Sequence, residues 1–264
     1  MRYTDQQHFK ELSGYQINGT WYPRVTKILE IKSKPGLEQF LCEVGDFARA
    51  EEIKNKSAAH GTLVHESVQK RATGEAHAVP EEVRPAVEAF EEFNKERKIL
   101  FLPEFIERQV WSPRHRYAGT VDALALVDGK FGVLDIKTST GFFPEYNLQT
   151  AAYVSALQEF DVKRSVGLPR DIETRWILRI DQLRTCRVCG STLREKGGRS
   201  KVRNGKNGNG KVHCEEDVHE WGELAGVAEL REFPYLYRDI KAFIAAKTLW
   251  EWENDYWLRK IGYV

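Results

Sequence analysis

The sequence predicts a mixed α/β (α+β) fold in which a small central sheet is flanked by helices. Apolar residues recur at helical spacing in the N-terminal part of the chain. Short apolar runs joined by a strong turn dipeptide follow between residues 105 and 137, and helical spacing returns after 146 and after 237. Helices, then a small sheet, then further helices are the element order of an α/β or α+β core.

The N-terminal part is predicted to contain a hairpin and three helices. Residues 15–25 have strand character around Asn18-Gly19, a dipeptide typical of two-residue hairpin turns. Apolar residues at helical spacing then predict three helices, over 37–54, 58–72 and 80–98. The third begins with Pro80-Glu81-Glu82, and proline and acidic residues are favourable in a first helical turn.

The central part is predicted to supply the sheet. Three strands are expected, over 105–111, 119–127 and 131–137, and Asp128-Gly129 joins the last two as a hairpin. The remaining elements are a helix over 146–160, a strand over 173–181, a short strand over 227–233 and a final amphipathic helix over 237–258. Residues 184–221 interrupt this pattern with many glycine, asparagine and basic residues.

Composition fits one sizeable core with an insertion. The chain has 264 residues, of which 41% are hydrophobic and 30% charged. No apolar run reaches the roughly 20 residues that cross a bilayer, and the first residues do not resemble a signal peptide. We therefore expect a cytoplasmic protein without a membrane partner. Oligomeric state is not predicted.

Three residues on two neighbouring predicted strands form a candidate catalytic group. The Asp128-Gly129 hairpin places Asp122 and Asp135 on adjacent strands, and Lys137 leaves the same strand face as Asp135. Two carboxylates can hold Mg²⁺ or Mn²⁺, and a lysine beside them can orient a water or stabilise developing charge. An Asp-x-Lys by itself is more often a structural ion pair.

Four further residues occur at spacings that suit the same site. His65 lies in a predicted helix that also contains Gly61, although a lone helical histidine is more often structural. Gln149 and Tyr153 are four apart and share a helical face. Glu107 lies on the strand preceding Asp122 and could act at the same site.

Together these residues resemble the RecB-like, phage exonuclease-like branch of the PD-(D/E)XK nuclease superfamily. The motifs that carry the resemblance occur in the family's order: Gly61…His65, Gly119…Asp122, Asp135-Ile136-Lys137 and Gln149…Tyr153. The resemblance covers about residues 15–181 and 227–258. It implies a restriction-endonuclease-like core formed by residues 1–183 and 222–264, interrupted by a basic, zinc-knuckle-like module over 184–221.

The resemblance also implies a role for each motif residue. The metal ligands would be His65, Asp122, Asp135 and the backbone carbonyl of Ile136, and the metal would be Mg²⁺ or Mn²⁺. Lys137 would act on the attacking water. Gln149 and Tyr153 would steady Lys137 or contact the DNA backbone. Glu107 would be an accessory acid, with Glu104 close enough to compete for that role.

The interrupting segment contains a candidate zinc site. Cys186-x-x-Cys189 is followed by Cys214 and His219, and tetrahedral zinc accepts Cys and His at such spacings. His213 is a rival fourth ligand, and a loop with free thiols is the alternative. Some RecB-like nucleases, including those of CRISPR adaptation, carry a four-cysteine iron–sulfur cluster. Cys42 would complete that set, although it also fits the apolar face of its helix.

The same segment carries most of the chain's excess positive charge. Nine basic residues and one acidic residue lie between Arg184 and Cys214, a net +8 in a chain of net charge +1. Such a patch suits phosphate, and we expect DNA contacts from Arg199, Lys201, Arg203 and Lys206. A solvated loop is the alternative. Phe142, Phe143 and Tyr146 are candidates for stacking on bases or for core packing.

These expectations favour a metal-dependent deoxyribonuclease of a bacterium or a phage-infected cell. An exonuclease that acts on linear DNA ends in recombination, repair or phage replication is favoured over a sequence-specific endonuclease. A recombination or single-strand-annealing protein is an expected partner. The rival class is a nucleic-acid-binding module with little catalysis, and the iron–sulfur nuclease is a further alternative.

Overall fold

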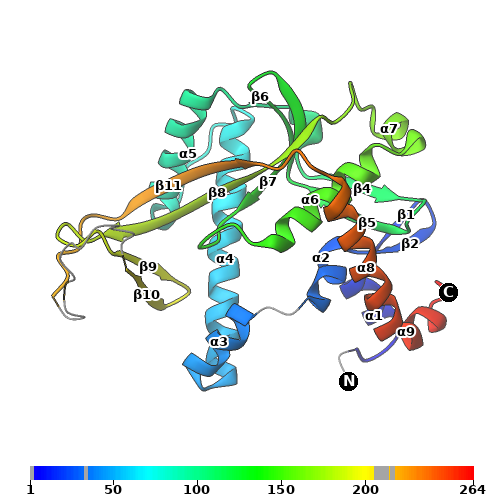
Figure 1. Cartoon of the computed structure of the whole chain (residues 1–264), viewed down its shortest axis with the longest axis horizontal. Coiled ribbons are helices and arrows are strands. Elements are labelled where there is room, and N and C mark those ends of the chain that lie inside the picture. The colour runs from blue at the N-terminus through cyan, green and yellow to red at the C-terminus, as the bar shows by residue number, and fades with distance from the viewer. Residues whose placement is uncertain (1–2, 33–34, 205–213, 215–217) are drawn as a thin grey trace.

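The computed structural model describes residues 3–32, 35–204, 214 and 218–264 and is a mixed α/β structure (Figure 1). Its described strands form a central, mostly antiparallel sheet in the order β10-β9-β8-β7-β6-β3, and β11 pairs with β8. These strands are β3 (Leu100–Phe101), β6 (Ala123–Val127), β7 (Lys130–Lys137), β8 (Thr174–Thr185), β9 (Thr192–Lys196), β10 (Arg199–Arg203) and β11 (Ala225–Glu232). The predicted mixed α/β class is confirmed.

Two short hairpins accompany the main sheet, β1 (Gly14–Ile17) with β2 (Thr20–Pro23) and β4 (Arg108–Ser112) with β5 (Tyr117–Val121). The predicted turns are confirmed: Asn18 and Gly19 join β1 to β2, and Asp128 and Gly129 join β6 to β7. All four turn residues have positive φ, which two-residue hairpin turns require.

Helices cover both faces of the sheet (Figure 1). Their bounds are α1 (Gln6–Ser13), α2 (Val25–Ile28), α3 (Pro35–Val44), α4 (Phe47–Ala72), α5 (Arg84–Arg97), α6 (Pro144–Leu157), α7 (Phe160–Val166), α8 (Tyr237–Glu253) and α9 (Asp255–Lys260), with 3₁₀ turns at Leu29–Ile31, Glu81–Val83 and Pro103–Phe105. One buried cluster joins α4 and α5 to β6, β7 and β8, and another joins α6 and α8 to the opposite face. No described helix combines the length and apolar character that a membrane span needs.

Several predicted boundaries are wrong because local backbone chemistry overrides the apolar pattern. The helix expected over 37–54 breaks at Gly45, whose φ is +67°, and Asp46 then caps α4 by accepting hydrogen bonds from the Ala48 and Arg49 amides. The strand expected over 119–127 divides at Asp122 into β5 and β6. The final helix divides at Asn254, and the β9–β10 hairpin was not predicted.

The C-terminal helix α8 is tied to the central sheet by a buried ion pair. The Arg175 side chain on β8 is 2% exposed and donates hydrogen bonds to the Asp239 carboxylate and to the Tyr235 carbonyl. Burial lowers the pKa of Arg175, while the Asp239 carboxylate opposes that shift. Asp239 therefore offsets part of the cost of burying this guanidinium.

We predict that Asp239→Ala destabilises the protein by about 2–4 kcal/mol, because it leaves a buried cation without its carboxylate partner. Urea denaturation measures the free energy of unfolding. The matched control is Glu52→Ala, which removes an exposed i,i+4 pair with Lys56 and should cost less than about 0.5 kcal/mol. Equal losses in the two variants would contradict the assignment.

Candidate functional site

Asp135 and Lys137 lie at the C-terminal end of β7, a strand with neighbours on both sides. The alternation along β7 turns Phe131 and Val133 toward the α6 face, and Asp135 and Lys137 continue that face. The Asp135 side chain is fully buried, whereas the Lys137 side chain is 18% exposed. Lys137 Nζ lies 2.6 Å from Asp135 Oδ2, so the buried carboxylate is paired with an ammonium that reaches the surface.

Asp122 lies between β5 and β6, where the strand path breaks. Its Oδ2 accepts a hydrogen bond of 2.7 Å from the amide of Ile136, which lies between Asp135 and Lys137. The Asp122 carbonyl accepts a further bond of 3.1 Å from the Glu107 amide. The break in the strand thus turns the Asp122 carboxylate toward the end of β7.

His65 reaches the same place from α4. Its Nδ1 lies 3.9 Å from Asp122 Oδ2, and it also hydrogen-bonds the backbone of Ile136. One helical turn earlier, a Cβ on Gly61 would lie 2.8 Å from Thr138 Oγ1. Glycine at this position therefore allows α4 to approach the chain just beyond Lys137, and this close approach brings His65 to the carboxylates.

Helix α6 supports the buried carboxylate from the other side. Gln149 Nε2 donates to Asp135 Oδ1 at 3.1 Å and to the Tyr153 hydroxyl at 3.0 Å. A Cβ on Gly119 would lie 2.5 Å from the Tyr153 ring, so Gly119 makes room for it. Tyr153 is only 2% exposed, which argues against the expected contact with DNA. Gln149 steadies Asp135 rather than Lys137.

The accessory acid is better placed at Glu107 than at Glu104. Glu107 accepts a hydrogen bond from Gln69 and, with His65 and Thr138, lines a groove of about 590 Å³ on α4. Glu107 has a φ of 51°, in the left-handed region. Glu104 lies in the preceding 3₁₀ turn and does not line this groove.

Burial dominates the electrostatics of this group. It raises the pKa of Asp122 and of Asp135 to about 6 in each case, against the opposing influence of Lys137. Burial alone would lower the pKa of Lys137, but Asp135 and Asp122 outweigh it, so the pKa is raised and the side chain stays an ammonium. Burial and the nearby Lys137 lower the pKa of His65, which favours the neutral imidazole.

The residues fit a divalent cation by their donor chemistry. Two carboxylates, a neutral imidazole and the Ile136 carbonyl are ligands that Mn²⁺ and Mg²⁺ accept, with carboxylates as the preferred donors. The fully buried Asp135 and the partly buried Asp122 carry two carboxylates with raised pKa values against one ammonium, so a further positive charge between them would be stabilising. Their ligand atoms are not yet as close together as a metal shell requires, so the side chains would have to close around an ion.

A second group, the Cys/His cluster, could hold a metal ion as the structure stands. It consists of Cys186, Cys189, Cys214 and His219, whose ligand atoms all lie within 4.8 Å of one another. Cys186 Sγ is 3.9 Å from Cys214 Sγ, and Cys189 Sγ is 3.3 Å from His219 Nδ1. Within the described part of the chain, no other set of His, Cys, Asp and Glu meets this criterion.

The Cys/His cluster bears on two of the sequence expectations about the ligands. His219 is one of its four residues, while the rival His213 lies outside the described residues, so the choice between the two histidines stays a prediction. Cys42 does not belong to the cluster, and it is exposed on α3 rather than packed in a core. The turn at Gly190, with φ of +71°, lets its amide donate to the Cys186 carbonyl and so forms the knuckle.

The β9–β10 hairpin that follows the knuckle holds the loop after Lys137. Three consecutive carbonyls of this loop each accept a hydrogen bond from a cationic side chain of β8, β9 or β10. The bonds are Arg194 Nη2 to Thr138 O at 3.1 Å, Lys196 Nζ to Thr138 O at 2.8 Å, Arg179 Nη1 to Ser139 O at 3.2 Å and Arg203 Nη1 to Thr140 O at 2.9 Å. We call this arrangement the carbonyl clamp.

Sequence reasoning did not identify the carbonyl clamp, although a signal for it was present. Basic residues alternate at 194 and 196 and again at 199, 201 and 203, on either side of Gly197-Gly198. Alternation on both sides of a Gly-Gly dipeptide is typical of a hairpin. The segment was interpreted instead as an irregular basic loop.

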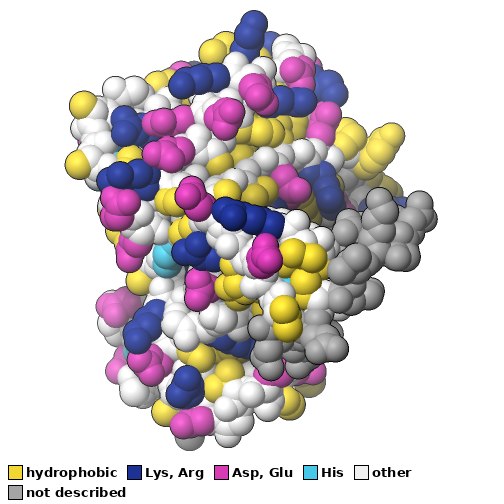
Figure 2. Space-filling view, turned by 90° about the vertical axis from the view of Figure 1, so that its left-hand side faces the viewer, with side chains coloured by type: hydrophobic (Ala, Val, Ile, Leu, Met, Phe, Trp, Pro, Cys, Tyr) yellow, Lys and Arg dark blue, Asp and Glu magenta, His cyan; other side chains and the backbone are white. Residues whose placement is uncertain are grey.

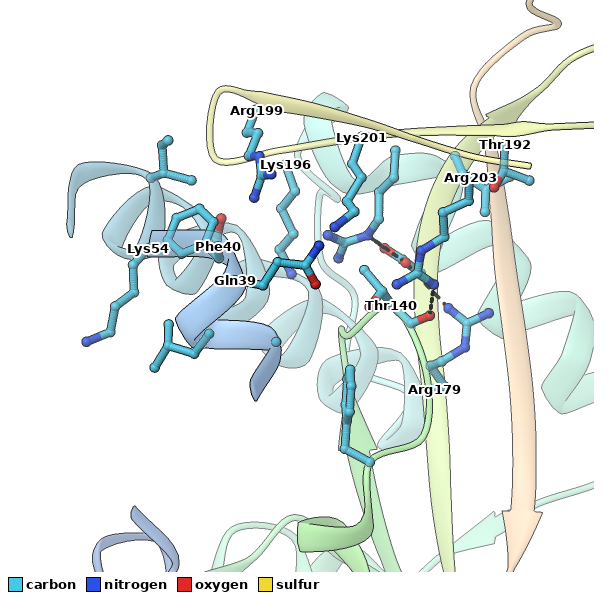
Figure 3. A pocket seen from close by; sticks show the side chains of 18 of the residues that line it. Gln39, Phe40, Lys54, Thr140, Arg179, Thr192, Lys196, Arg199, Lys201 and Arg203 are labelled. Carbon is cyan, nitrogen blue, oxygen red and sulfur yellow. Dashed lines mark hydrogen bonds and ion pairs between the residues drawn. The ribbon is translucent and has the colours of Figure 1, made fainter. Parts of the chain in front are cut away.

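Three of the four basic residues expected to contact DNA line one pocket (Figure 3). Arg199, Lys201 and Arg203 extend from β10 into this pocket of about 940 Å³, between α3, α4 and the loop after Lys137. Arg199 forms an ion pair with Glu43. Lys206, the fourth expected contact, lies outside the described residues.

Comparison with family models and with curated proteins found no match to this chain. The resemblance to PD-(D/E)XK nucleases therefore rests on the motif residues and their arrangement.

We predict that Asp135→Asn stabilises the protein in buffer without added divalent metal. Folding raises the pKa of Asp135 from 3.8 to about 6, so between these values the native protein binds more protons than the unfolded chain and its stability falls as pH rises. The variant cannot ionise and should gain about 1–3 kcal/mol at pH 7.5 and no more than about 0.5 kcal/mol at pH 4. Thermal or urea denaturation at the two pH values measures the gain.

The control is Asp128→Asn, which changes an exposed carboxylate in a turn that asparagine also accepts. It should change stability little at either pH. A loss of stability in Asp135→Asn at pH 7.5, or a gain that does not depend on pH, would contradict the assigned cost of burying this carboxylate.

Proposed function

We propose that this protein is a metal-dependent deoxyribonuclease. The observation that carries the proposal is the meeting of Asp122, Asp135 and Lys137 at the end of β7, with His65 entering from α4. Residues from a helix, a strand break and a central strand converge there, and the pKa of each is displaced by burial or by the others. Clustered displaced pKa values beside a surface groove are typical of catalytic sites.

In this proposal the metal ligands are His65, Asp122, Asp135 and the Ile136 carbonyl. A bound Mg²⁺ or Mn²⁺ would polarise the phosphoryl oxygen and acidify a water. Gln149 keeps the Asp135 carboxylate turned toward the site, and the amide of Ile136 does the same for Asp122.

Lys137 acts as a cation in this proposal. Its raised pKa keeps it protonated at neutral pH, so it donates hydrogen bonds to the attacking water or to the charge that develops on the phosphate. It does not serve as the base.

The substrate class follows from the charge around the site. Eight basic and two acidic side chains line the 940 Å³ pocket beside the loop that follows Lys137. Phosphodiesters are the polyanions that such a lining accepts. By its resemblance to phage exonuclease-like members, we propose an exonuclease that acts on DNA ends. A binding module with little catalysis would use the same pocket, so the two classes are separated by cleavage and not by affinity.

We predict that Asp122→Ala, Asp135→Ala and Lys137→Ala each lower the cleavage rate at least about 100-fold, because each removes a ligand or a stabilising charge. The assay follows end-labelled linear DNA and closed circular DNA with Mg²⁺ or Mn²⁺, with and without EDTA. Loss of linear DNA alone indicates an exonuclease, and circular DNA is cut only by an endonuclease.

The matched control for Lys137→Ala is Lys95→Ala, an exposed lysine on α5 that lines neither the pocket nor the groove. It should cleave like the wild type. Circular dichroism checks the fold of every variant. Wild-type rates in all three site variants would overturn the proposal, and a wild-type protein that binds DNA without cutting it would support the binding-module class.

We also propose that the Cys/His cluster holds zinc. Three thiolates and one imidazole in a small turn-rich module are a typical structural zinc shell. The alternative iron–sulfur cluster requires Cys42 as a fourth thiolate, but His219 fills that place among the described residues.

We predict that Cys189→Ser loses the zinc and lowers the Tm by about 5 °C or more, because zinc binding contributes directly to folding of such modules. Cys42→Ser should retain both the metal and the Tm. Elemental analysis and differential scanning calorimetry measure the two quantities. A brown, iron-containing wild type that loses its colour in Cys42→Ser would establish the iron–sulfur alternative instead.

A further inference from the structure

The pocket under the β9–β10 hairpin has the chemistry of a binding channel. Basic side chains enter from the hairpin, and the rings of Phe40, Phe143 and Tyr146 line other parts of the wall. Figure 3 shows Lys201 and Arg203 directed from β10 into the space between α3, α4 and Thr140. Backbone-tracking cations combined with aromatic platforms are typical of sites for single-stranded nucleic acid.

The hairpin closes this pocket on its outer side. A Cβ on Gly197, in the β9–β10 turn, would lie 2.2 Å from Ser57 Oγ and 2.4 Å from the Ile53 carbonyl of α4. The next strand adds the ion pair between Arg199 and Glu43 of α3. The hairpin is therefore held at both ends, by β8 at its base and by α3 and α4 at its tip, and it spans the pocket as a roof.

The pocket adjoins the proposed catalytic group. Tyr146, in its wall, lies with its ring centroid 5.1 Å from Lys137 Nζ. Ser57 lines both this pocket and the groove that contains His65 and Glu107. A chain that occupies the pocket would thus lead directly to the residues proposed to cut it.

Several cations of the pocket are not neutralised by carboxylates. The side chain of Lys201 forms no ion pair or hydrogen bond with another residue that the structure describes, although its charge helps to lower the pKa of Glu43. Lys196 and Arg203 bond only to the uncharged oxygens of Thr138 and Thr140. The positive charge of Lys196 is costly where it lies, since burial lowers its pKa to about 8. A phosphate group is the complement that these side chains lack.

The aromatic ring of Phe143 is available to an unpaired base. Phe143 is 41% exposed and meets Tyr146 edge to face, with ring centroids 5.7 Å apart. Phe40 lies across the pocket under the Arg199 guanidinium, and Arg199 Cζ is 5.0 Å from the centroid of the Phe40 ring. Bases within a duplex stack on each other and offer only their edges, so aromatic side chains can stack only on bases that are unpaired.

From these observations we propose that the pocket binds single-stranded DNA and conducts one strand beneath the hairpin to the catalytic group. This inference rests on the proposed nuclease function and adds the form of the substrate and its route. Lys201 and Arg203 hold phosphates, and Phe143 stacks on a base next to the scissile bond.

The lining of the pocket favours one strand over a duplex. The bases of a duplex are paired and stacked on each other, so Phe143 can stack on a base only where the two strands are separated. In this proposal a duplex substrate is therefore unwound before one strand enters beneath the hairpin, which contacts α4 at Gly197.

The test measures binding separately from cleavage. Fluorescence anisotropy in EDTA compares a labelled oligothymidylate with a blunt duplex of equal length, over a series of salt concentrations. The wild type should bind the single strand at least about tenfold tighter. Lys201→Gln should weaken that binding about fivefold at 0.1 M salt and reduce the salt slope by about 0.7, the value for one lost phosphate contact on a single strand.

The aromatic contact has its own variant. Phe143→Ala should weaken single-strand binding about fivefold or more while leaving the salt slope unchanged, because stacking is not an ionic contact. The matched control for Lys201→Gln is Lys95→Gln, which should bind like the wild type. A duplex that binds as tightly as the single strand, or wild-type binding in both Lys201→Gln and Phe143→Ala, would overturn the proposal. Preference for an RNA oligomer over its DNA counterpart would also overturn it.

The two proposals can fail separately. If the protein binds single strands through Lys201 and Phe143 but never cleaves them, the binding pocket is supported and the nuclease function is contradicted. If cleavage requires Asp135 but does not change in the Lys201 and Phe143 variants, the nuclease function is supported and the single-strand route is contradicted.

Discussion

The candidate site depends on the burial of one carboxylate. Asp135 has no exposed side-chain surface, and a buried carboxylate is stable only with charge or hydrogen-bond partners around it. Lys137 supplies the charge and Gln149 supplies a hydrogen bond. The partners come from β7 itself and from α6, and Asp122 is anchored to the same strand through the Ile136 amide. The packing of α6 against β7 is thus inseparable from the chemistry of the site.

The carbonyl clamp extends this dependence to the Cys/His cluster. Cys186 and Cys189 of the cluster lie between β8 and β9, and the β9–β10 hairpin that follows donates to the Thr138 and Thr140 carbonyls just after Lys137. The Cys/His cluster and Lys137 are therefore linked by one hairpin and one loop. The inserted segment supports the end of β7 as well as carrying positive charge, which explains why several of its cations are turned inward.

The sequence predicted the centre of the fold better than its edges. Asp128-Gly129 and Asn18-Gly19 define their hairpins through positive φ, and that local rule held at both turns. The helix breaks at Gly45 and Asn254 were missed because the apolar spacing continues across them. Spacing on the predicted hairpin placed Asp122, Asp135 and Lys137 together, and the resemblance to PD-(D/E)XK nucleases added His65 to them. The structure brings all four side chains to the end of β7.

The environment of those residues was not predictable in the same way. Burial of Tyr153 depends on Gly119 leaving space for its ring, and the bond from Gln149 to Asp135 depends on how α6 crosses β7. The carbonyl clamp needs contacts between residues 40 to 63 positions apart along the chain. Such contacts follow from tertiary packing, and the local spacing of residues in the sequence does not predict them.

The basic side chains of the inserted segment are not arranged as their sequence predicts. Its net +8 led to the expectation of an exposed basic patch, yet on the face in Figure 2 basic and acidic side chains are interspersed. The described cations of the hairpin instead line the pocket of Figure 3, where Arg199 pairs with α3, Lys196 and Arg203 contact carbonyls, and Lys201 and Arg203 stay exposed to solvent. Exposed cations along one wall can meet the phosphates of a bound strand, and their attraction weakens as the salt concentration rises. This arrangement supports the proposal that the pocket takes a single strand, and it makes salt dependence a direct measure of the contacts of Lys201 and Arg203.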